Sequence, residues 1–167
     1  MVLGISTLLG RRRLGFRIHE VMSGTHEFVG KTGPKGEFPF SFELDWGTDN
    51  LLEFLNPFSG QSFTAKAEGV VRMGEFVDEA PCSGTLEFCY FTEAKIRYRF
   101  TFTVGGNTYE YIGEKVEIRP WNLHRTHTTC YGVVYDVKQG KEISRSITYF
   151  DVAALPAFLS SFRIVRP

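Results

Sequence analysis

Every second residue between Lys95 and Val104 is apolar, and the residues between them are basic or carry a hydroxyl group. Because successive side chains of a β-strand point to opposite faces, a period of two predicts a strand with one buried face. The sequence Gly105-Gly106-Asn107 follows directly and predicts a tight hairpin turn. This stretch does not fit a helix with one apolar face, and it therefore restricts the chain to a β-rich fold.

The same alternation recurs along the chain and predicts eight strands. They cover residues 14–22, 37–46, 62–73, 85–90, 95–104, 109–118, 126–137 and 143–149. Short connections of this kind favour sequential antiparallel pairing, and closure of the sheet removes exposed strand edges. The fold class we expect is all-β, an eight-stranded antiparallel up-and-down barrel in one domain over residues 1–167.

Several local features are expected to modify this barrel. A short helix is predicted near 49–55, and a second helical segment is predicted after Asp151, with Pro156 separating its first turn from the rest. Residues 78–84 are rich in loop-forming residues and predict a loop. The apolar row changes parity at Gly113, which predicts a β-bulge.

Composition excludes several classes of protein. The chain has 19 Lys and Arg residues against 19 Asp and Glu residues, so no net charge would attract nucleic acid. Its three cysteines are odd in number and form no CxxC motif, which argues against a disulfide framework and fits a reducing cytoplasm. No apolar run approaches the ~20 residues of a membrane span. The sequence predicts a cytoplasmic protein with no membrane span and no nucleic-acid partner.

The sequence contains no motif that defines a catalytic centre. Neither a GxSxG motif nor a Ser-His-Asp order is present, and no dinucleotide fingerprint precedes a helix, so we predict no catalytic residue and no cofactor. His124, His127 and Cys130 are spaced by three residues. On a strand, odd spacing sends side chains to opposite faces, but His124 is expected before the strand, so convergence stays open. Loop and surface histidines are the favoured interpretation, and we predict no metal site.

Two charged residues occupy apolar rows of their strands. Glu20 lies in the row of the first strand, and Arg145 lies in the row of the last. These strands are neighbours in an up-and-down barrel, so the two side chains can pair inside it, and an unpaired buried charge is too costly to tolerate. The two charges form a structural ion pair, or they lie in a row that has already left the core, or they are the polar anchor of a small-molecule site. Lys115 is a third polar candidate.

The aromatic rows are open to two interpretations. They form a packed core, or they line a cavity for a small apolar molecule whose polar atoms satisfy the tyrosine hydroxyls. In the second case the predicted ligand-binding residues are Glu20, Phe40, Phe42, Tyr98, Phe100, Tyr109, Tyr111 and Arg145.

The order of strands resembles lipocalin-like (calycin-type) barrels. A second resemblance is to the β-rich region that accompanies cholesterol-oxidase-like flavoproteins of the glucose–methanol–choline group. It rests on Glu20-Val21-Met22-Ser23-Gly24, Gly84-Thr85-Leu86, Tyr98-Arg99-Phe100-Thr101-Phe102, Tyr111-Ile112-Gly113-Glu114-Lys115, and Asp151 with its helix. The resemblance implies an accessory or ligand-binding barrel near steroid or lipid oxidation that carries no flavin of its own.

Three functions are consistent with these observations. The first is a binding module that holds a small apolar ligand, lipid- or sterol-like, with Glu20 or Arg145 as polar anchor. The second is a barrel-type cyclase or isomerase that holds a reactive ligand in shape. The third is an accessory protein that binds a flavoprotein, or a second copy of itself as a homodimer, through its surface phenylalanines.

Overall fold

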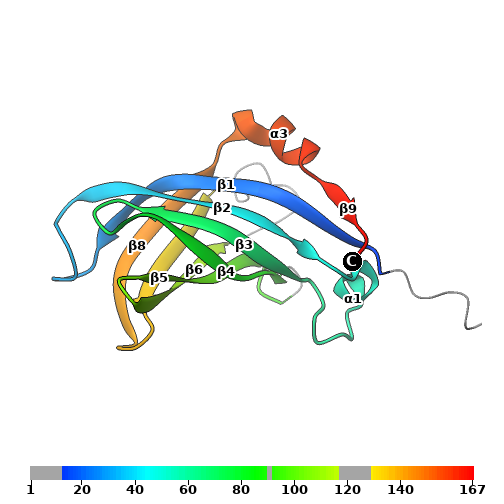
Figure 1. Cartoon of the computed structure of the whole chain (residues 1–167), viewed down its shortest axis with the longest axis horizontal. Coiled ribbons are helices and arrows are strands. Elements are labelled where there is room, and N and C mark those ends of the chain that lie inside the picture. Colours follow the sequence, from blue (N-terminus) through cyan, green and yellow to red (C-terminus); the bar gives the residue numbers. More distant parts are fainter. Residues whose placement is uncertain (1–12, 90–91, 117–128) are drawn as a thin grey trace, which may run out of the picture.

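The computed structural model describes residues 13–89, 92–116 and 129–167, and these residues form a closed antiparallel β-barrel (Figure 1). Eight long strands follow one another around it. They are β1 (Gly15–Phe28), β2 (Glu37–Thr48), β3 (Thr64–Met73), β4 (Val77–Cys89), β5 (Lys95–Val104), β6 (Asn107–Lys115), β7 (Thr129–Asp136) and β8 (Lys141–Phe150).

The barrel closes because β1 pairs on both of its sides. Along one side it pairs with β2 over almost its whole length, and along the other its second half pairs with β8, from Met22 opposite Phe150 to Phe28 opposite Ser144. The remaining pairings among the eight long strands join strands that are consecutive in the sequence. The predicted eight-stranded up-and-down barrel is therefore confirmed.

The two ends of the barrel differ in the connections between their strands. At one end lie the short turns, including the Gly105-Gly106 turn, where both glycines have positive φ as a tight hairpin with this twist requires. At the other end lies α1 (Leu51–Leu55), and we call this the α1 end (Figure 1). The side chain of Asn50 caps α1 by accepting a hydrogen bond from the Glu53 amide.

The C-terminal segment lies outside the barrel against β1 (Figure 1). Asp151 caps a 3-10 turn, η2 (Val152–Ala154), and α3 (Leu155–Ser160) follows with Pro156 in its first turn, as predicted. A short ninth strand, β9 (Arg163–Val165), then pairs with the start of β1. None of the helices that the structure describes is long and apolar enough to cross a membrane.

The expected loop at 78–84 is wrong, because this stretch belongs to β4. Its loop-forming residues are compatible with a strand here for local reasons. Pro81 is opposite Val70 of β3. It directly precedes Cys82, the first residue of β4 that pairs with β5. A proline is tolerated at such a position because its missing N–H removes no bond to a second neighbour.

The expected bulge at Gly113 is also wrong. Pairing of β6 with β5 runs without a shift from Val104 opposite Asn107 to Ile96 opposite Lys115. The register shifts instead between Val71 and Met73 in β3 and between Val134 and Tyr135 in β7. Gly113 faces the interior, and a glycine is needed there because the Tyr111 ring, described below, leaves no room for a side chain.

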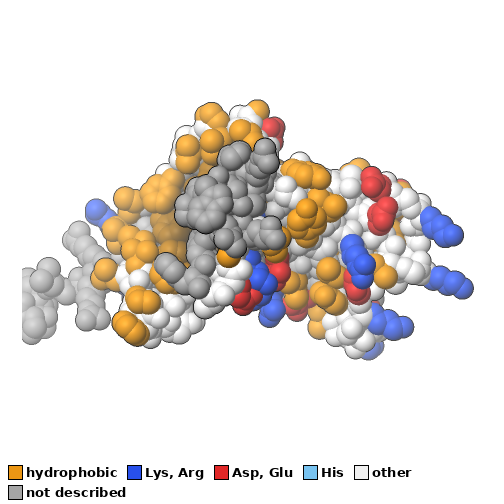
Figure 2. All heavy atoms as spheres, turned by 180° about the vertical axis from the view of Figure 1, so that it is seen from behind, with side chains coloured by type: hydrophobic (Ala, Val, Ile, Leu, Met, Phe, Trp, Pro, Cys, Tyr) orange, Lys and Arg blue, Asp and Glu red, His pale blue; other side chains and the backbone are white. Residues whose placement is uncertain are grey.

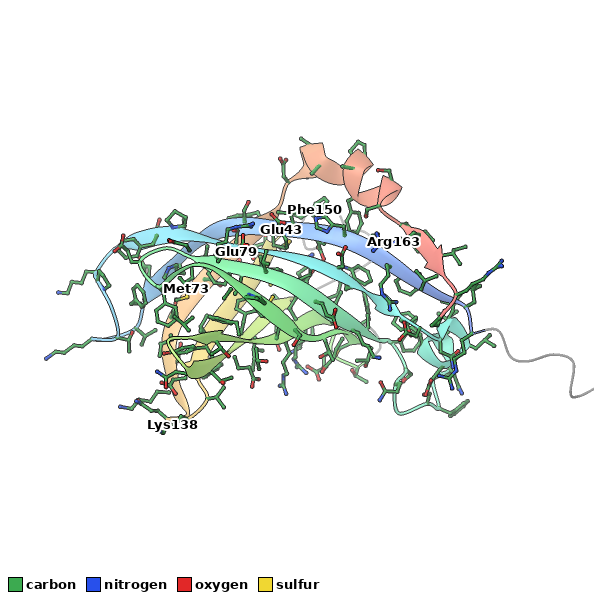
Figure 3. The ribbon with its side chains drawn as sticks, viewed as in Figure 1. Glu43, Met73, Glu79, Lys138, Phe150 and Arg163 are labelled. Atoms are coloured by element: carbon green, nitrogen blue, oxygen red, sulfur yellow. The ribbon has the colours of Figure 1, made fainter. Side chains whose placement is uncertain are left out.

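The interior is filled mainly by aromatic and aliphatic side chains of β2 to β6. Met73 is buried among them near the end opposite α1, whereas Glu43 and Glu79 lie on the outside, where both bind Arg72 (Figure 3).

The outer face of α3 is apolar and exposed, and it forms the top of the molecule in Figure 2. Its exposed apolar side chains, with those of η2, are Val152, Leu155 and Leu159.

Candidate functional site

A buried carboxylate with three hydrogen-bond donors lies inside the barrel, toward the α1 end. The Nζ atom of Lys115 is 2.9 Å from Glu20 Oε1. The Tyr98 hydroxyl is 3.0 Å from Oε2 and 3.1 Å from Oε1, and the indole N–H of Trp46 donates to Oε2 at 3.1 Å. We call Glu20, Trp46, Tyr98 and Lys115 the carboxylate cluster.

Each member reaches the cluster because its strand directs alternate residues inward. Tyr98 belongs to the inner row of β5, and Lys115 is opposite Ile96 of that same row. Trp46 is the cross-strand neighbour of Ile18, two residues before Glu20 on β1. Of the three donors, Tyr98 belongs to the predicted ligand-binding set and Lys115 is the third polar candidate from the sequence. The role of Trp46 was missed.

Among the described residues, the part of β1 that carries Glu20 has no strand neighbour on one side. Pairing with β8 stops at Met22, and pairing with β9 covers only Gly15 to Arg17. Between these two segments the Ser161 side chain replaces a strand. Its oxygen accepts from the His19 amide at 2.9 Å, and its hydroxyl lies 2.6 Å from the Phe158 carbonyl oxygen and 3.3 Å from that of His19. The C-terminal segment therefore completes the wall beside the cluster.

The charges of the cluster are almost fully withdrawn from water. The side chains of Glu20 and Lys115 are 6% and 4% exposed, respectively. The Lys115 ammonium also lies 5.2 Å from the centre of the Tyr98 ring, a favourable cation–π position. Burial, followed by the charge of Glu20, raises the pKa of Tyr98 well above its usual value, so its hydroxyl keeps its proton and donates.

A polar wall extends from the cluster across β6, β7 and β8. The register that pairs Glu114 with Tyr131 brings Lys115 beside Cys130, which in turn is opposite Thr148. On this wall the ring of Tyr111 lies over two glycines, and a Cβ atom added at Gly113 or at Gly132 would overlap it. The Tyr111 hydroxyl ends 3.6 Å from Cys130 Sγ.

Two hydroxyl groups on this wall have unused hydrogen-bonding capacity. Ser146 and Thr148 are buried near the Tyr111 hydroxyl, yet neither Ser146 Oγ nor Thr148 Oγ1 makes a hydrogen bond of regular geometry to any described residue. Burial raises the pKa of Tyr111 well above its usual value and that of Cys130 to about 11. Both groups therefore stay protonated, and Cys130 is a poor nucleophile.

The predicted aromatic candidates are brought together, but they pack against one another. Phe42 contacts the rings of Tyr98, Phe100 and Tyr111 at centroid distances of 5.4 to 5.5 Å. Phe40 stacks on Tyr111 at 5.4 Å. Tyr109 lies apart from this group, with its ring edge-on to Phe76. The centre of the barrel is thus an aromatic core, and the polar candidates lie at its margin.

Arg145 does not face the interior, and the expected pair with Glu20 is wrong. Its side chain is 69% exposed and binds Glu142 on the outer surface. The inner row of β8 consists of Ser144, Ser146 and Thr148. Alternation correctly separated the two rows of this strand, but the outer row is the more apolar one because the inner row must leave room for the Tyr111 ring.

A second buried polar group lies toward the opposite end of the barrel. The imidazole of His26 is 1% exposed, and its Nδ1 and Nε2 atoms lie 2.8 Å from Ser144 Oγ and 2.9 Å from the Gly74 carbonyl oxygen. Nε2 must donate to the carbonyl, so Nδ1 accepts from the serine hydroxyl. Sequence reasoning missed this contact, because nothing in a strand sequence shows which residue of another strand lies opposite its inner face.

We expect the stability of the protein to fall in mild acid because of His26. Burial lowers the pKa of His26 below its ordinary value of 6.5, although the bond to Gly74 opposes this. The neutral ring is therefore favoured by the folded state, and its contribution is complete above pH 6.5 and declines as the pH falls toward the folded-state pKa. Urea unfolding between pH 7.5 and pH 5 measures the effect.

The matched comparison for this pH dependence uses the chain's other described histidine. His19 lies on the outer surface beside Asp45. We expect the free energy of unfolding of His26→Gln to fall less in acid than that of the wild type. The fall caused by His26 should persist in His19→Gln. Equal pH dependence in the wild type and His26→Gln would contradict the assignment.

Other possible sites are less developed. Over the described residues, no three His, Cys, Asp or Glu side chains are grouped as a metal site would require. His124 and His127 lie outside the described residues. A hollow of about 380 Å³ on the outer surface between β1, β7 and β8 is lined by Glu27, Tyr131, Val133, Arg145 and Ile147, among others.

Comparison of this chain with protein-family models, with curated proteins and with solved structures finds no match. The fold and the carboxylate cluster therefore carry the functional argument, and what they define is a closed antiparallel β-barrel with a buried ion pair near one end.

Proposed function

We propose that this protein is a binding module that holds a small, mainly apolar molecule, lipid- or sterol-like, at the α1 end of the barrel. The observation that carries the proposal is the carboxylate cluster. Buried ion pairs are costly to form and are often no more stabilising than apolar residues of the same size. An ion pair kept inside the barrel at the margin of its aromatic core is therefore consistent with a polar anchor for a ligand.

The surroundings of the cluster support this location. The rings of Phe16, Trp46, Phe54 and Phe88 lie at the α1 end and are half-buried. They meet mostly edge to face, with the Phe16 and Trp46 centroids 5.9 Å apart and the Trp46 and Phe88 centroids 5.5 Å apart. Half-buried rings above a polar anchor suit a ligand with an apolar body and one polar end.

The tightly packed core limits where a ligand would bind. Phe42 and its neighbouring rings contact each other directly, so a ligand in the centre of the barrel would have to displace them. We infer that the ligand lies on the α1 side of this core, against the carboxylate cluster. Of the predicted ligand-binding set, Glu20 and Tyr98 then belong to the site, and the remaining rings support it.

The other two functions stay predictions from the sequence. A cyclase or isomerase would require the same barrel end to hold a reactive ligand. An accessory role, including one beside a flavoprotein, would use exposed apolar side chains such as Phe58 and Phe162. We favour the binding module because the stability of a barrel does not require a buried carboxylate cluster, whereas a ligand anchor does.

The proposal is tested by titrating the purified protein with Nile red, a neutral apolar dye, and by native mass spectrometry of the untreated protein. We expect saturable binding of one dye per chain. Lys115→Met should weaken it about tenfold, the effect of losing one hydrogen bond to a charged group. Lys141→Met, on the exposed start of β8, is the matched control and should leave the affinity unchanged.

Native mass spectrometry is independent of any effect of the substitution on folding. A small molecule that copurifies with the wild-type protein and is released by denaturation would support the proposal directly. The proposal fails if the dye shows no saturable binding and the protein carries no small molecule, and equally if both lysine variants bind the dye as the wild type does.

A further inference from the structure

Most of the acceptor capacity of Glu20 is already taken up by the protein. Its Oε1 atom receives Lys115 and Tyr98, and its Oε2 atom receives Trp46 and shares the Tyr98 hydroxyl. A carboxylate with these three donors is satisfied on both oxygens. These three donors leave about one of its four acceptor positions for a further donor.

The donor capacity of Lys115 is not exhausted in the same way. An ammonium group carries three N–H bonds. Its acceptor among the residues that the structure describes is Glu20 Oε1, and the ring of Tyr98 faces the group from 5.2 Å. Since the side chain is 4% exposed, bulk water scarcely reaches it. The cluster therefore has more spare donors, on Lys115, than spare acceptors, on Glu20.

Charge imposes a second restriction on the ligand. Glu20 and Lys115 form a close ion pair, in which one negative and one positive charge balance. An anionic ligand would bring a second negative charge beside Glu20, and a cationic ligand would bring a second positive charge beside Lys115. Either would leave an unbalanced charge in a site withdrawn from water, which is strongly unfavourable.

The polar wall next to Lys115 supplies an independent indication of a ligand. Thr148 is 0% exposed, and its hydroxyl oxygen lacks a partner of regular geometry among the described residues, although it lies close enough to Tyr111 and Cys130 to lower the pKa of each. Buried hydroxyls are normally satisfied by protein or by a bound molecule. A hydroxyl both donates and accepts, so this wall accommodates a neutral oxygen and does not require a charge.

We propose that the ligand's polar end is a neutral oxygen acceptor, such as an alcohol or ketone, that binds the Lys115 ammonium beside the hydroxyl of Thr148. This inference rests on the proposed binding function and narrows its ligand class. It excludes fatty-acid anions and alkyl amines as the preferred ligands, although they have the same apolar body.

The test is displacement of Nile red by compounds with similar straight chains and different polar ends: decanol, methyl octyl ketone, decanoate and decylamine. We expect decanol and the ketone to compete about tenfold more strongly than either charged compound, at a pH where both are ionised. Lys115→Met should reduce this preference to near unity. Lys141→Met should retain it.

A second variant keeps the inference testable if Lys115→Met does not fold. Thr148→Val removes only the hydroxyl at nearly constant shape, and it should weaken the binding of decanol more than that of Nile red. If decanoate or decylamine proves the strongest competitor, this inference is overturned while the binding function stands. If neither the dye nor any of the four compounds binds, both are overturned.

Discussion

Replacing Lys115 by methionine is expected to lower the free energy of unfolding by about 3–5 kcal/mol, because it leaves the Glu20 carboxylate buried without its cation. The Tyr98 and Trp46 donors remain, but neither carries a charge. Urea or guanidinium unfolding followed by circular dichroism measures the loss. The same substitution at a surface pair would have little effect, since exposed ion pairs contribute about 1 kcal/mol or less.

A double variant separates the ion pair from the rest of the cluster. Glu20→Gln with Lys115→Met removes both charges and keeps an oxygen acceptor for Tyr98 and Trp46. We expect it to be more stable than Lys115→Met alone, which would give a favourable coupling between the two sites. Arg145→Ala provides the surface control, because that side chain is 69% exposed and binds Glu142 outside the barrel. Equal losses for Lys115→Met and Arg145→Ala would contradict a buried pair.

Phe42→Ala is expected to cost about 3–5 kcal/mol, the range for removing a large buried ring. Phe42 is 0% exposed, and the rings of Phe40, Tyr98, Phe100 and Tyr111 surround it. The substitution would leave a cavity that neighbouring rings can fill only in part. Chemical unfolding of Phe42→Ala and of the control variant Phe58→Ala under the same conditions measures the loss of stability.

Phe58 is the appropriate control because its side chain is 96% exposed. Its removal is expected to change the stability by about 0.5 kcal/mol or less. A loss below about 1 kcal/mol for Phe42→Ala would show that the centre of the barrel is loosely filled. In that case the ligand site would have to extend further into the barrel than the α1 end.

These predictions depend on features that the sequence indicated to different degrees. Glu20 was recognisable because a single acidic residue interrupts an apolar row of its strand, and such a residue needs a partner when buried. Its partner was assigned to Arg145 by assuming that the more apolar row of β8 faces inward. The structure instead brings in Lys115, which stands at the end of β6, because β5 aligns Lys115 with Ile96 beside Tyr98.

The polar wall was not recognised at all, although it left a trace in the sequence. Small or hydroxyl residues alternate through Cys130, Gly132, Ser144, Ser146 and Thr148 on two consecutive strands. Read as an inner face, this row would have implied a large side chain opposite it, and that side chain is Tyr111. The row was overlooked because Tyr131, Ile147 and Tyr149 make the outer face more apolar.

Alternation along the chain was sufficient to predict the strands, their antiparallel order and closure into a barrel, because the period of two and the short turns are local properties. It was also sufficient to single out Glu20. Tertiary structure alone decided which face of β7 and β8 points inward, that 78–84 pairs as a strand, and that Lys115 rather than Arg145 neutralises Glu20. These outcomes depend on register and on the volume of side chains across the barrel, such as Tyr111 over Gly113 and Gly132, which no single strand encodes.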